Sequence, residues 1–342
     1  MTVTEPDRRH LLTGLGLLSL TAAAAPWRAL AAAAISPVPR ARVIIDNDFS
    51  GDPDGLFQLA HHLLSPSVAV PFVIGSHIHA GDFLDGSPTQ GDNAAARART
   101  LIAMIGSGHH PPVLAGRNTA PPPGAPPQAT AITRRILAEA WRSDTKLPLV
   151  YAAGAGLTEL AEAVRIDPAI GPRIRLVWIG GREWPDLTGG VPWRRDAEYN
   201  MTIDGAAART LFNDSTVEIW QVPRNVYRQM LVSMAELRAA LRPAGAVGAF
   251  LLDALEQVRR HQDDRLGETY ILGDSPLVTL TALLSSFEPD ASSSDYVIRP
   301  TPILNEDGSY TRRAEARPMR VYRSIDARLT FGDLFAKLAI HR

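Results

Sequence analysis

Residues 43–59 (VIIDNDFSGDPDGLFQL) join a strand-like run, a cluster of aspartates and the start of a helix. Residues 42–45 form a short β-branched run, which predicts a buried strand. Apolar residues then recur at helical spacing over residues 56–64, and Ser65-Pro66 ends that pattern. The aspartates therefore stand directly after a strand, at its carboxyl end.

The same alternation of strands and helices continues along the chain. Further strands are expected at residues 68–75, 112–116, 149–153, 175–179 and 217–222. Helices are expected at residues 93–105, 157–164 and 206–212, with a helical region at 234–265 and a last apolar stretch at 272–284. This alternation predicts one α/β domain over residues 35–342, with a largely parallel, Rossmann-like central sheet flanked by helices. Ligands of such sheets bind at the carboxyl ends of the strands, where the aspartates lie.

The first 34 residues have the order of a signal peptide. Arg8 and Arg9 precede an apolar run at residues 11–25, and an alanine-rich stretch follows at 29–34. The run is shorter than the roughly 20 residues that a membrane span needs. The paired arginines favour the twin-arginine export route. We therefore expect a periplasmic or secreted protein, and the alternative is an amphipathic N-terminal helix of a cytoplasmic protein.

Composition narrows the possible chemistry. The sequence has no cysteine, which excludes disulfides, thiolate metal sites and cysteine nucleophiles. The formal net charge is −1, and no long basic stretch favours nucleic acid as a partner. Beyond the N-terminal run, no segment of the sequence is apolar enough to predict a membrane span. We expect a small-molecule partner.

The acidic cluster indicates a metal site. Asp46, Asp48, Asp52 and Asp54 fall within nine residues, and carboxylates this close repel one another unless a cation neutralises them. Oxygen ligands suit a hard cation such as Ca²⁺ or Mg²⁺. The alternative is that Asp52-Pro53 only caps a helix while the other aspartates are solvated. A cap explains one aspartate and leaves Asp46 and Asp48 without a role, so the metal site is favoured.

A phosphatase of the haloacid dehalogenase type also begins with a strand and D-x-D. That family has Thr or Val where this chain has Ser50, and it needs a downstream lysine. The only lysines are Lys146 and Lys337, and neither lies in a matching context. The phosphatase reading is therefore disfavoured.

Five segments, in order along the chain, resemble the inosine/uridine-preferring nucleoside hydrolase family. Residues 43–59 are similar to the family's opening strand and its D-x-D-P-G-x-D-D motif. Residues 156–161 (GLTELA) resemble P-L-T-N-L-A, and residues 178–181 (WIGG) resemble M-G-G. Residues 197–204 (AEYNMTID) resemble A-E-F-N-x-x-x-D, and residues 273–277 (GDSPL) resemble H-D-P-x-A.

The resemblance implies metal-dependent hydrolysis of the N-glycosidic bond of ribonucleosides to ribose and free base, by a dimer or tetramer. It implies a Ca²⁺ ion held by Asp48, by the main-chain carbonyl of Thr158 and by Asp274. Asp54 is the candidate for the ligand that Pro53 displaces. The ion would chelate two ribose hydroxyls and one water, and Asp48 would be the catalytic base for that water.

The resemblance also implies the residues that bind the sugar. Asp52, Glu198 and Asn200 would hydrogen-bond its hydroxyls, with Glu198 and Asn200 on one face of an extended segment. Ser76 stands where the family has a sugar-binding asparagine. Carboxylates below the ring suit this reaction, because cleavage of an N-ribosidic bond develops positive charge on the sugar.

Other positions are expected to bind the base or to support the site. Trp193, with Trp184 nearby, offers an aromatic face on which a base can stack. Asp46 is expected to support the metal ligands without binding the ion itself. Asn93 matches a family asparagine whose role is mainly structural.

Two departures leave alternatives open. Pro53 breaks the family's adjacent aspartate pair, and Gly273 replaces a histidine that is thought to help protonate the leaving base. His77, His79 and His261 are the other candidates for that acid. The departures motivate a second hypothesis, a non-catalytic ribosyl- or nucleoside-binding protein of the same fold. A third is a hydrolase of another N-riboside.

Overall fold

The structure is a computed structural model that describes residues 38–106, 110–188, 194, 196–261, 267–285 and 294–341. The predicted signal peptide at residues 1–34 and the predicted base-binding Trp193 lie outside the described residues. Both predictions therefore stay predictions.

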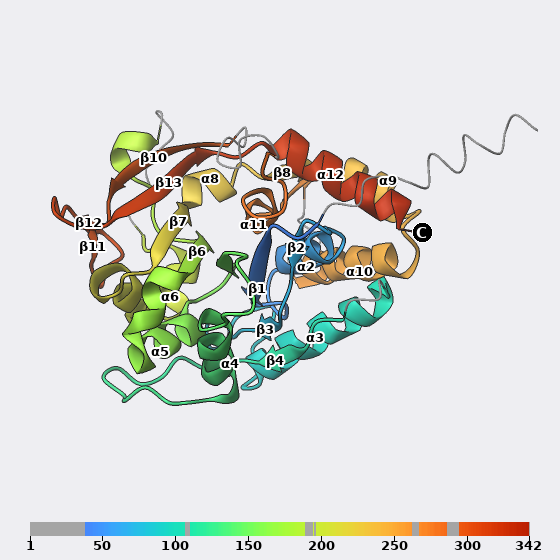
Figure 1. The fold of residues 1–342 in the computed structure, drawn as a ribbon. Coiled ribbons are helices and arrows are strands. Elements are labelled where there is room, and N and C mark those ends of the chain that lie inside the picture. The colour runs from blue at the N-terminus through green and yellow to red at the C-terminus, as the bar shows by residue number, and fades with distance from the viewer. Residues whose placement is uncertain are drawn as a thin grey trace, which may run out of the picture. The chain divides into compact units, whose positions relative to one another are not determined.

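The strands form one central sheet (Figure 1). In sheet order they are β10 (Asp295–Pro300), β13 (Pro318–Ser324), β7 (Glu218–Val222), β6 (Ile174–Ile179), β5 (Leu149–Ala153), β1 (Ala41–Asn47), β3 (Val73–Gly75) and β4 (Val113–Ala115), with β2 (Val68–Ala69) paired to β1. All neighbours are parallel except β10, which runs antiparallel to β13 at one edge. The predicted, largely parallel sheet is confirmed.

Helices cover both faces of this sheet (Figure 1). One layer contains α2 (Asp54–Leu63), α3 (Gln90–Ile105), α9 (Met234–Leu241), α10 (Gly245–His261), α11 (Pro276–Thr279) and α12 (Ala327–Ile340). The other contains α4 (Ala131–Ala140), α5 (Thr158–Ile166), α6 (Tyr199–Ile203) and α7 (Gly205–Arg209). Short elements complete the described chain: α8 (Arg224–Tyr227), the 3₁₀ turns Pro168–Arg173 and Pro185–Leu187, the π turn Thr210–Asp214, and the strand pairs β8 (Leu231–Ser233) with β9 (Thr269–Ile271) and β11 (Ile303–Leu304) with β12 (Tyr310–Thr311).

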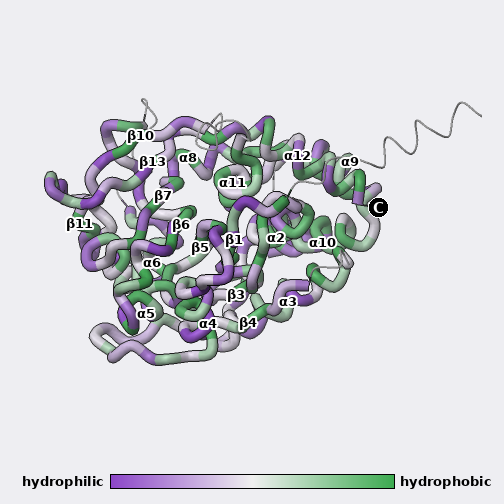
Figure 2. The backbone as a smooth tube through the Cα atoms, viewed as in Figure 1, coloured by the Kyte–Doolittle hydropathy of each residue, from purple (hydrophilic) through white to green (hydrophobic). Residues whose placement is uncertain are grey.

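The sheet separates two hydrophobic cores. Val43 and Ile45 of β1 pack into the core under α2 and α3, and Ile44 packs into the core on the opposite face. Because side chains alternate along a strand, a strand buried on both faces is apolar throughout. Figure 2 shows this as hydrophobic colour along the central strands.

Some predicted elements have different bounds. The expected strand at residues 68–75 is two short strands, β2 and β3. The helical region from residue 234 is divided into α9 and α10, with Pro243 and the left-handed Gly245 (φ 60°) at the junction. Its last part, residues 262–265, lies outside the described residues. The last apolar stretch forms only the short helix α11.

The register of the strands brings several strand ends to one edge of the sheet. Asn47 of β1 lies opposite Gly75 of β3, and Asp46 lies opposite Ala153 of β5. Ala153 in turn lies opposite Trp178 of β6. We call this the carboxyl edge, and the aspartates that follow β1 lie on it.

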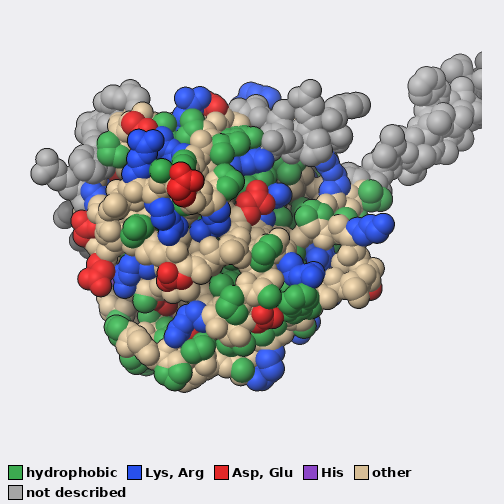
Figure 3. Space-filling view, turned by 60° about the vertical axis from the view of Figure 1, so that its left-hand side comes forward, with side chains coloured by type: hydrophobic (Ala, Val, Ile, Leu, Met, Phe, Trp, Pro, Cys, Tyr) green, Lys and Arg blue, Asp and Glu red, His purple; other side chains and the backbone are tan. Residues whose placement is uncertain are grey.

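Two further observations concern the surface. On the face drawn in Figure 3, lysine and arginine side chains are interspersed with aspartate and glutamate. None of the described helices is both long and apolar enough to cross a membrane.

Gly75 supplies a test of how tightly the carboxyl edge is packed. A Cβ atom there would lie 2.3 Å from the backbone nitrogen of Ala95 in α3, and backbone cannot move aside cheaply. Gly75→Ala should therefore lower the free energy of unfolding by about 1–3 kcal/mol, measured by urea denaturation. Gly332→Ala is the control, because no atom lies within 4 Å of a Cβ on this α12 residue. It should raise the free energy of unfolding by up to about 1 kcal/mol; equal effects would contradict the prediction.

Candidate active site

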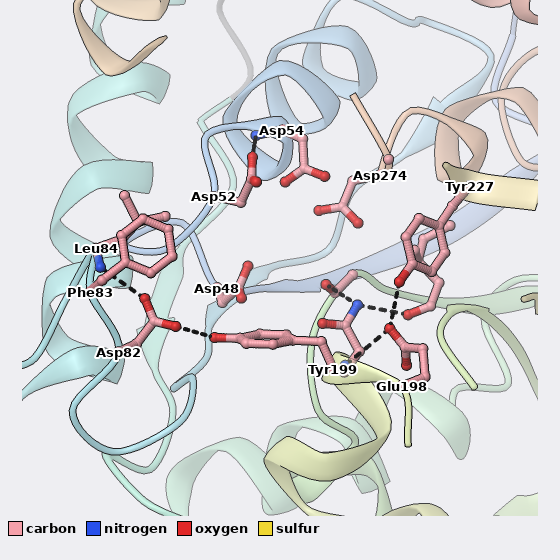
Figure 4. Close-up of a pocket in the computed structure, with 14 residues that line it drawn as sticks. Asp48, Asp52, Asp54, Asp82, Phe83, Leu84, Glu198, Tyr199, Tyr227 and Asp274 are labelled. Atoms are coloured by element: carbon pink, nitrogen blue, oxygen red, sulfur yellow. Dashed lines mark hydrogen bonds between the residues drawn. The ribbon is translucent and has the colours of Figure 1, made fainter. Parts of the chain in front are cut away.

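A cavity of about 270 Å³ opens at the carboxyl edge (Figure 4). Six acidic residues line it: Asp48, Asp52, Asp54, Asp82, Glu198 and Asp274. No lysine, arginine or histidine of the described residues lines it. The site therefore concentrates negative charge without a protein cation to balance it.

Asp48 stands at the tip of β1 and is buried. Its backbone N–H donates to the side-chain oxygen of Asn47 at 2.8 Å, which fixes the turn out of the strand. Burial raises the pKa of Asp48 well above its ordinary value, and the charges of Asp274 and Asp52 raise it further.

Pro53 sets where the next carboxylates lie. It occupies the cap position of α2, so that Asp54 is the first helical residue and its carboxylate accepts from the N–H of Gly55 at 2.9 Å. Burial raises the pKa of Asp54 well above its ordinary value, and the charges of Asp274, Asp52 and Asp48 raise it further. Asp52 is instead exposed.

Asp52 is held at the rim of the cavity. Its carboxylate accepts from the hydroxyl of Tyr270 at 2.9 Å and from the backbone N–H of Asp54 at 3.2 Å. Asp54 is half-buried, whereas Asp52 faces solvent. The two aspartates on either side of Pro53 are therefore not equivalent.

Asp274 enters the cavity from the segment before α11 and is buried. It accepts from the side-chain amide of Asn47 at 2.8 Å, and burial raises its pKa to about 7. A Cβ atom on the preceding Gly273 would lie 3.2 Å from the Asp54 carboxylate and 3.3 Å from the Tyr227 ring. Asp54 and Tyr227 thus crowd the space that a side chain at position 273 would need.

Glu198 is buried in the wall with both carboxylate oxygens occupied. One oxygen accepts from Tyr227 Oη (2.8 Å) and Asn200 N (3.2 Å), and the other from Gly181 N (2.7 Å) and Met201 N (3.0 Å). Glu198 is the N-cap of α6. The expected extended segment is therefore wrong, because the chain turns into a helix at this residue.

Asn200 joins the ends of two strands. Its side-chain amide donates to the carbonyl of Gly154 after β5 at 3.0 Å and to that of Ile179 in β6 at 2.8 Å. The side-chain oxygen of Asn200 has no hydrogen-bond partner among the described residues. It is an acceptor available at the cavity wall.

Aromatic side chains form the outer part of the cavity. Phe83 is 55% exposed and Tyr199 is 42% exposed, and both line it. The Tyr199 hydroxyl donates to Asp82 at 2.6 Å (Figure 4). His79 packs edge-on against the Tyr199 ring at 4.7 Å between ring centroids. These contacts tie the segment that follows β3 to α6 across the cavity.

A family model for inosine-uridine preferring nucleoside hydrolases matches residues 43–337, which include all of the central sheet but the first two residues of β1, and every residue of the cavity. The chain belongs to this family. It is therefore a hydrolase that acts on N-glycosyl compounds, as the sequence motifs predicted.

Solved nucleoside hydrolases share the fold. A plant nucleoside hydrolase is 20% identical, with a TM-score of 0.64 over 88% of this chain and 99% of that chain. A purine-preferring ribonucleoside hydrolase from Gardnerella vaginalis is 16% identical, with a TM-score of 0.67 over 88% and 98%. The inosine-uridine preferring nucleoside hydrolase from Bacillus anthracis is 16% identical, with a TM-score of 0.63 over 87% and 99%. No curated protein sequence matches this chain.

Some residues that the family resemblance nominated lie away from the hydrolase cavity. Thr158 is the first residue of α5, and its hydroxyl donates to Asp204 at 2.8 Å. It lines a separate hollow beside residues 121–124. The residue of this strand-to-helix turn that lines the cavity is Gly154. The assignment of the carbonyl of Thr158 is corrected accordingly, because the turn points residue 154, and not residue 158, toward the aspartates.

Ser76 is also turned away from the cavity. Its hydroxyl donates to the buried carboxylate of Asp46, which also accepts from the hydroxyl of Tyr151. Burial raises the pKa of Asp46 to about 7. Ser76 therefore hydrogen-bonds to Asp46, outside the cavity. The prediction that Ser76 contacts the sugar is corrected.

Asn93 hydrogen-bonds to the segment that follows β3. Its amide donates to Asp85 at 3.0 Å and to Ser87 at 2.9 Å, within the segment that carries Asp82. It does not line the cavity. Trp184 is buried and stacked on Tyr310, with 4.3 Å between ring centroids, so it is unavailable to a base in the cavity.

None of the candidate histidines lines the cavity. His77 is buried, and His79 bonds to Thr202 at 3.0 Å. His261 bonds to the backbone of its own helix at 2.8 Å. The geometry gives these histidines no contact with a leaving base in the cavity.

The donor set fits a hard divalent cation. In the described chain, no three acidic or histidine side chains are already gathered closely enough to enclose an ion. The groups around the cavity that could bind a cation are nevertheless all oxygens, namely Asp48, Asp54, Asp274 and the nearby backbone of Gly154. Among the described residues that line the cavity, no side chain is a cation that could balance them. Burial is the largest cause of the raised pKa of each of these three aspartates, and the charge of a neighbouring carboxylate raises each pKa further.

Proposed function

We propose that this nucleoside hydrolase cleaves the N-glycosidic bond of ribonucleosides in a calcium-dependent reaction, releasing ribose and the free base. The observation that carries the proposal is the cavity itself. Asp48, Asp54 and Asp274 converge there from three separate segments of the chain, and no protein cation of the described residues lies among them. Family membership supplies the reaction class.

Asp48, Asp54, Asp274 and the Gly154 carbonyl would hold the ion. A calcium ion bound there would offset the charge of the carboxylates and favour the ionised form of a nearby water. Asp52 lies at the rim with its carboxylate open to solvent. We assign Asp52 to the sugar hydroxyls and Asp54 to the ion.

Asp48 is the catalytic base. It is buried at the centre of the acidic group, and its backbone is anchored by Asn47, so its position is fixed before substrate arrives. Asp48 takes a proton from the attacking water, whose oxygen forms the new bond to C1′ of the ribose. The C1′–N bond breaks with its electron pair going to the base, which leaves after gaining a proton from solvent.

Asn200, which lies in the cavity wall, orients the sugar. Its free carboxamide oxygen accepts from a ribose hydroxyl, while its amide group remains on Gly154 and Ile179. Glu198 supports this wall through the N–H of Asn200 and the Tyr227 hydroxyl. Its role is positioning, because each of its oxygens already accepts two hydrogen bonds.

The base lies at the outer, aromatic part of the cavity. Phe83 and Tyr199 expose ring surface there, and flat heteroaromatic bases stack favourably on such rings. Trp193, which the sequence also predicts to bind the base, lies outside the described residues. Stacking on rings accepts either purines or pyrimidines.

Hydrolysis of inosine, guanosine and uridine, each with Ca²⁺ and after chelation, tests the proposal. The wild-type protein should release base from at least one of them, and chelation should abolish the release. Asp48→Asn should lower kcat by about 10²–10⁴-fold, because the variant cannot take the proton from water. Nucleoside binding without release of base would overturn hydrolysis in favour of a binding protein, and turnover of another N-riboside alone would redirect the substrate class.

Asp54→Asn and Asp52→Asn are a matched pair that tests the assignment of ligand and sugar contact. Asp54→Asn should weaken Ca²⁺ binding at least about tenfold by calorimetry, because it removes one charge from the buried donor set. Asp52→Asn should leave Ca²⁺ affinity within about twofold while raising KM for the nucleoside, since a hydrogen bond to a charged group contributes about 1.5–3 kcal/mol. The reverse pattern would exchange the two roles.

We also propose that the protein is exported and that residues 1–34 are removed, on the order of charged, apolar and alanine-rich segments in the sequence. The expression of the full-length chain in bacteria should yield a periplasmic protein whose N-terminus, determined by mass spectrometry, lies near Ile35. An intact N-terminus on a cytoplasmic protein would contradict export. Assembly into a dimer or tetramer remains a proposal from the family resemblance.

A further inference from the structure

A line of buried polar side chains runs from the cavity into the core behind it. The Asn47 amide donates to Asp274 at 2.8 Å and to the side-chain oxygen of Gln58 at 3.2 Å. The Gln58 amide bonds to Nδ1 of His62, and Nε2 of His62 bonds to the hydroxyl oxygen of Thr281 at 2.7 Å. Asn47, Gln58 and His62 are all at most 1% exposed.

Thr281, at the end of this line away from the cavity, determines which atom is the donor in each of its hydrogen bonds. The Thr281 hydroxyl donates to the carbonyl of Leu277 at 2.6 Å, so its oxygen must accept a proton from His62 Nε2. Burial lowers the pKa of His62 to about 3, so the neutral ring carries only this one proton, and Nδ1 accepts from the Gln58 amide. Gln58 consequently turns its oxygen toward Asn47, and Asn47 turns its N–H groups toward Gln58 and Asp274.

The residues of this line also connect the chain segments that carry the cavity aspartates. Asn47 precedes Asp48 on β1, and Gln58 and His62 lie one turn apart on α2, the helix that Asp54 begins. Thr281 lies in the same stretch of chain as Asp274. Asn47, Gln58, His62 and Thr281 therefore link the three segments that supply Asp48, Asp54 and Asp274.

Two glycines make the space that Asn47 occupies. A Cβ atom on Gly55 would lie 2.9 Å from Asn47 Cγ, and one on Gly154 would lie 2.4 Å from Asn47 Nδ2. The Asn47 side chain is thus enclosed between α2 and the turn after β5. Its oxygen accepts from the Asp48 backbone N–H, so all of its polar atoms have a defined partner.

We propose that Asn47, Gln58 and His62 are positioning residues that hold Asp274 and Asp48 in place for the cation. The proposal rests on the proposed function. Asn47 binds one oxygen of Asp274, and Asp54 lies beside the same carboxyl group. If Asn47 were flipped, its oxygen would face the Asp274 carboxylate, and two acceptors would repel each other. Two contacts oppose this flip: the Asp48 N–H that donates to the Asn47 oxygen, and the Gln58 oxygen that the bond between Gln58 and His62 turns toward Asn47.

His62 is the residue to change, because it lies two hydrogen bonds behind Asn47 and does not line the cavity. His62→Leu removes the acceptor for Gln58. His62→Asn retains an acceptor near the position of Nδ1 and should rescue the effect. His61→Leu is the matched control: His61 is the adjacent helix residue, also 1% exposed, and it bonds to Asp333 at 2.8 Å, outside this line.

The measurement is the affinity of the full, purified protein for Ca²⁺ alone, by isothermal titration calorimetry. His62→Leu should bind Ca²⁺ roughly tenfold more weakly than wild type, as changes behind metal ligands do. His62→Asn and His61→Leu should remain within about twofold of wild type. Melting temperatures of both leucine variants should fall, because each loses a buried hydrogen bond, so only the Ca²⁺ affinity separates positioning from general destabilisation.

A measurement on the wild type covers the case in which His62→Leu does not fold. Nitrogen-15 NMR of the histidine rings should show His62 as the Nε2–H tautomer, assigned by the signal that is missing in His62→Asn. An Nδ1–H tautomer would overturn the proposal, and so would unchanged Ca²⁺ affinity in His62→Leu or an equal loss in His61→Leu.

If wild type binds Ca²⁺ but releases no base, the proposed hydrolysis fails while the Ca²⁺ affinities still decide the positioning role. If wild type binds no Ca²⁺, the positioning role for a cation site is overturned.

Discussion

The carboxylates at the carboxyl edge repel one another, and the surrounding structure must offset this repulsion. Burial raises the pKa of Asp48 and of Asp54, and the charge of Asp274 raises both further. Such an arrangement opposes folding unless dipoles or a cation offset the charge. The chain supplies the dipoles through the amide of Asn47 and the N–H of Gly55, and it leaves room for the cation.

The parallel sheet makes this concentration of charge possible. Parallel strands end at the same edge, so residues that follow β1, β5 and β6 meet although they are far apart in sequence. Backbone carbonyls at these ends would be left unpaired, and the Asn200 amide binds two of them at Gly154 and Ile179. The same side chain therefore completes the sheet edge and presents an acceptor to the cavity.

The sequence was sufficient to predict the sheet and most of the acidic cavity, because strand ends are visible as apolar runs that stop at polar residues. It could not show which residue of a turn faces inward, and so Thr158 was chosen where Gly154 lines the cavity. The bond from Asn47 to Asp274 spans 227 positions and leaves no local pattern. The C-terminal strands β10 and β13 were missed because their polar and partly exposed residues do not form an apolar run.

The two departures from the family pattern, Pro53 and Gly273, meet at one carboxylate. Pro53 caps α2, so that Asp54 begins the helix and lines the cavity. That carboxylate lies 3.2 Å from where a Cβ on residue 273 would be, and Tyr227 closes the other side. A side chain at 273 would begin in tight contact with both groups, and each would have to shift by a few tenths of an ångström. Glycine therefore fits this crowded position, and its presence does not by itself indicate a site that has lost its chemistry.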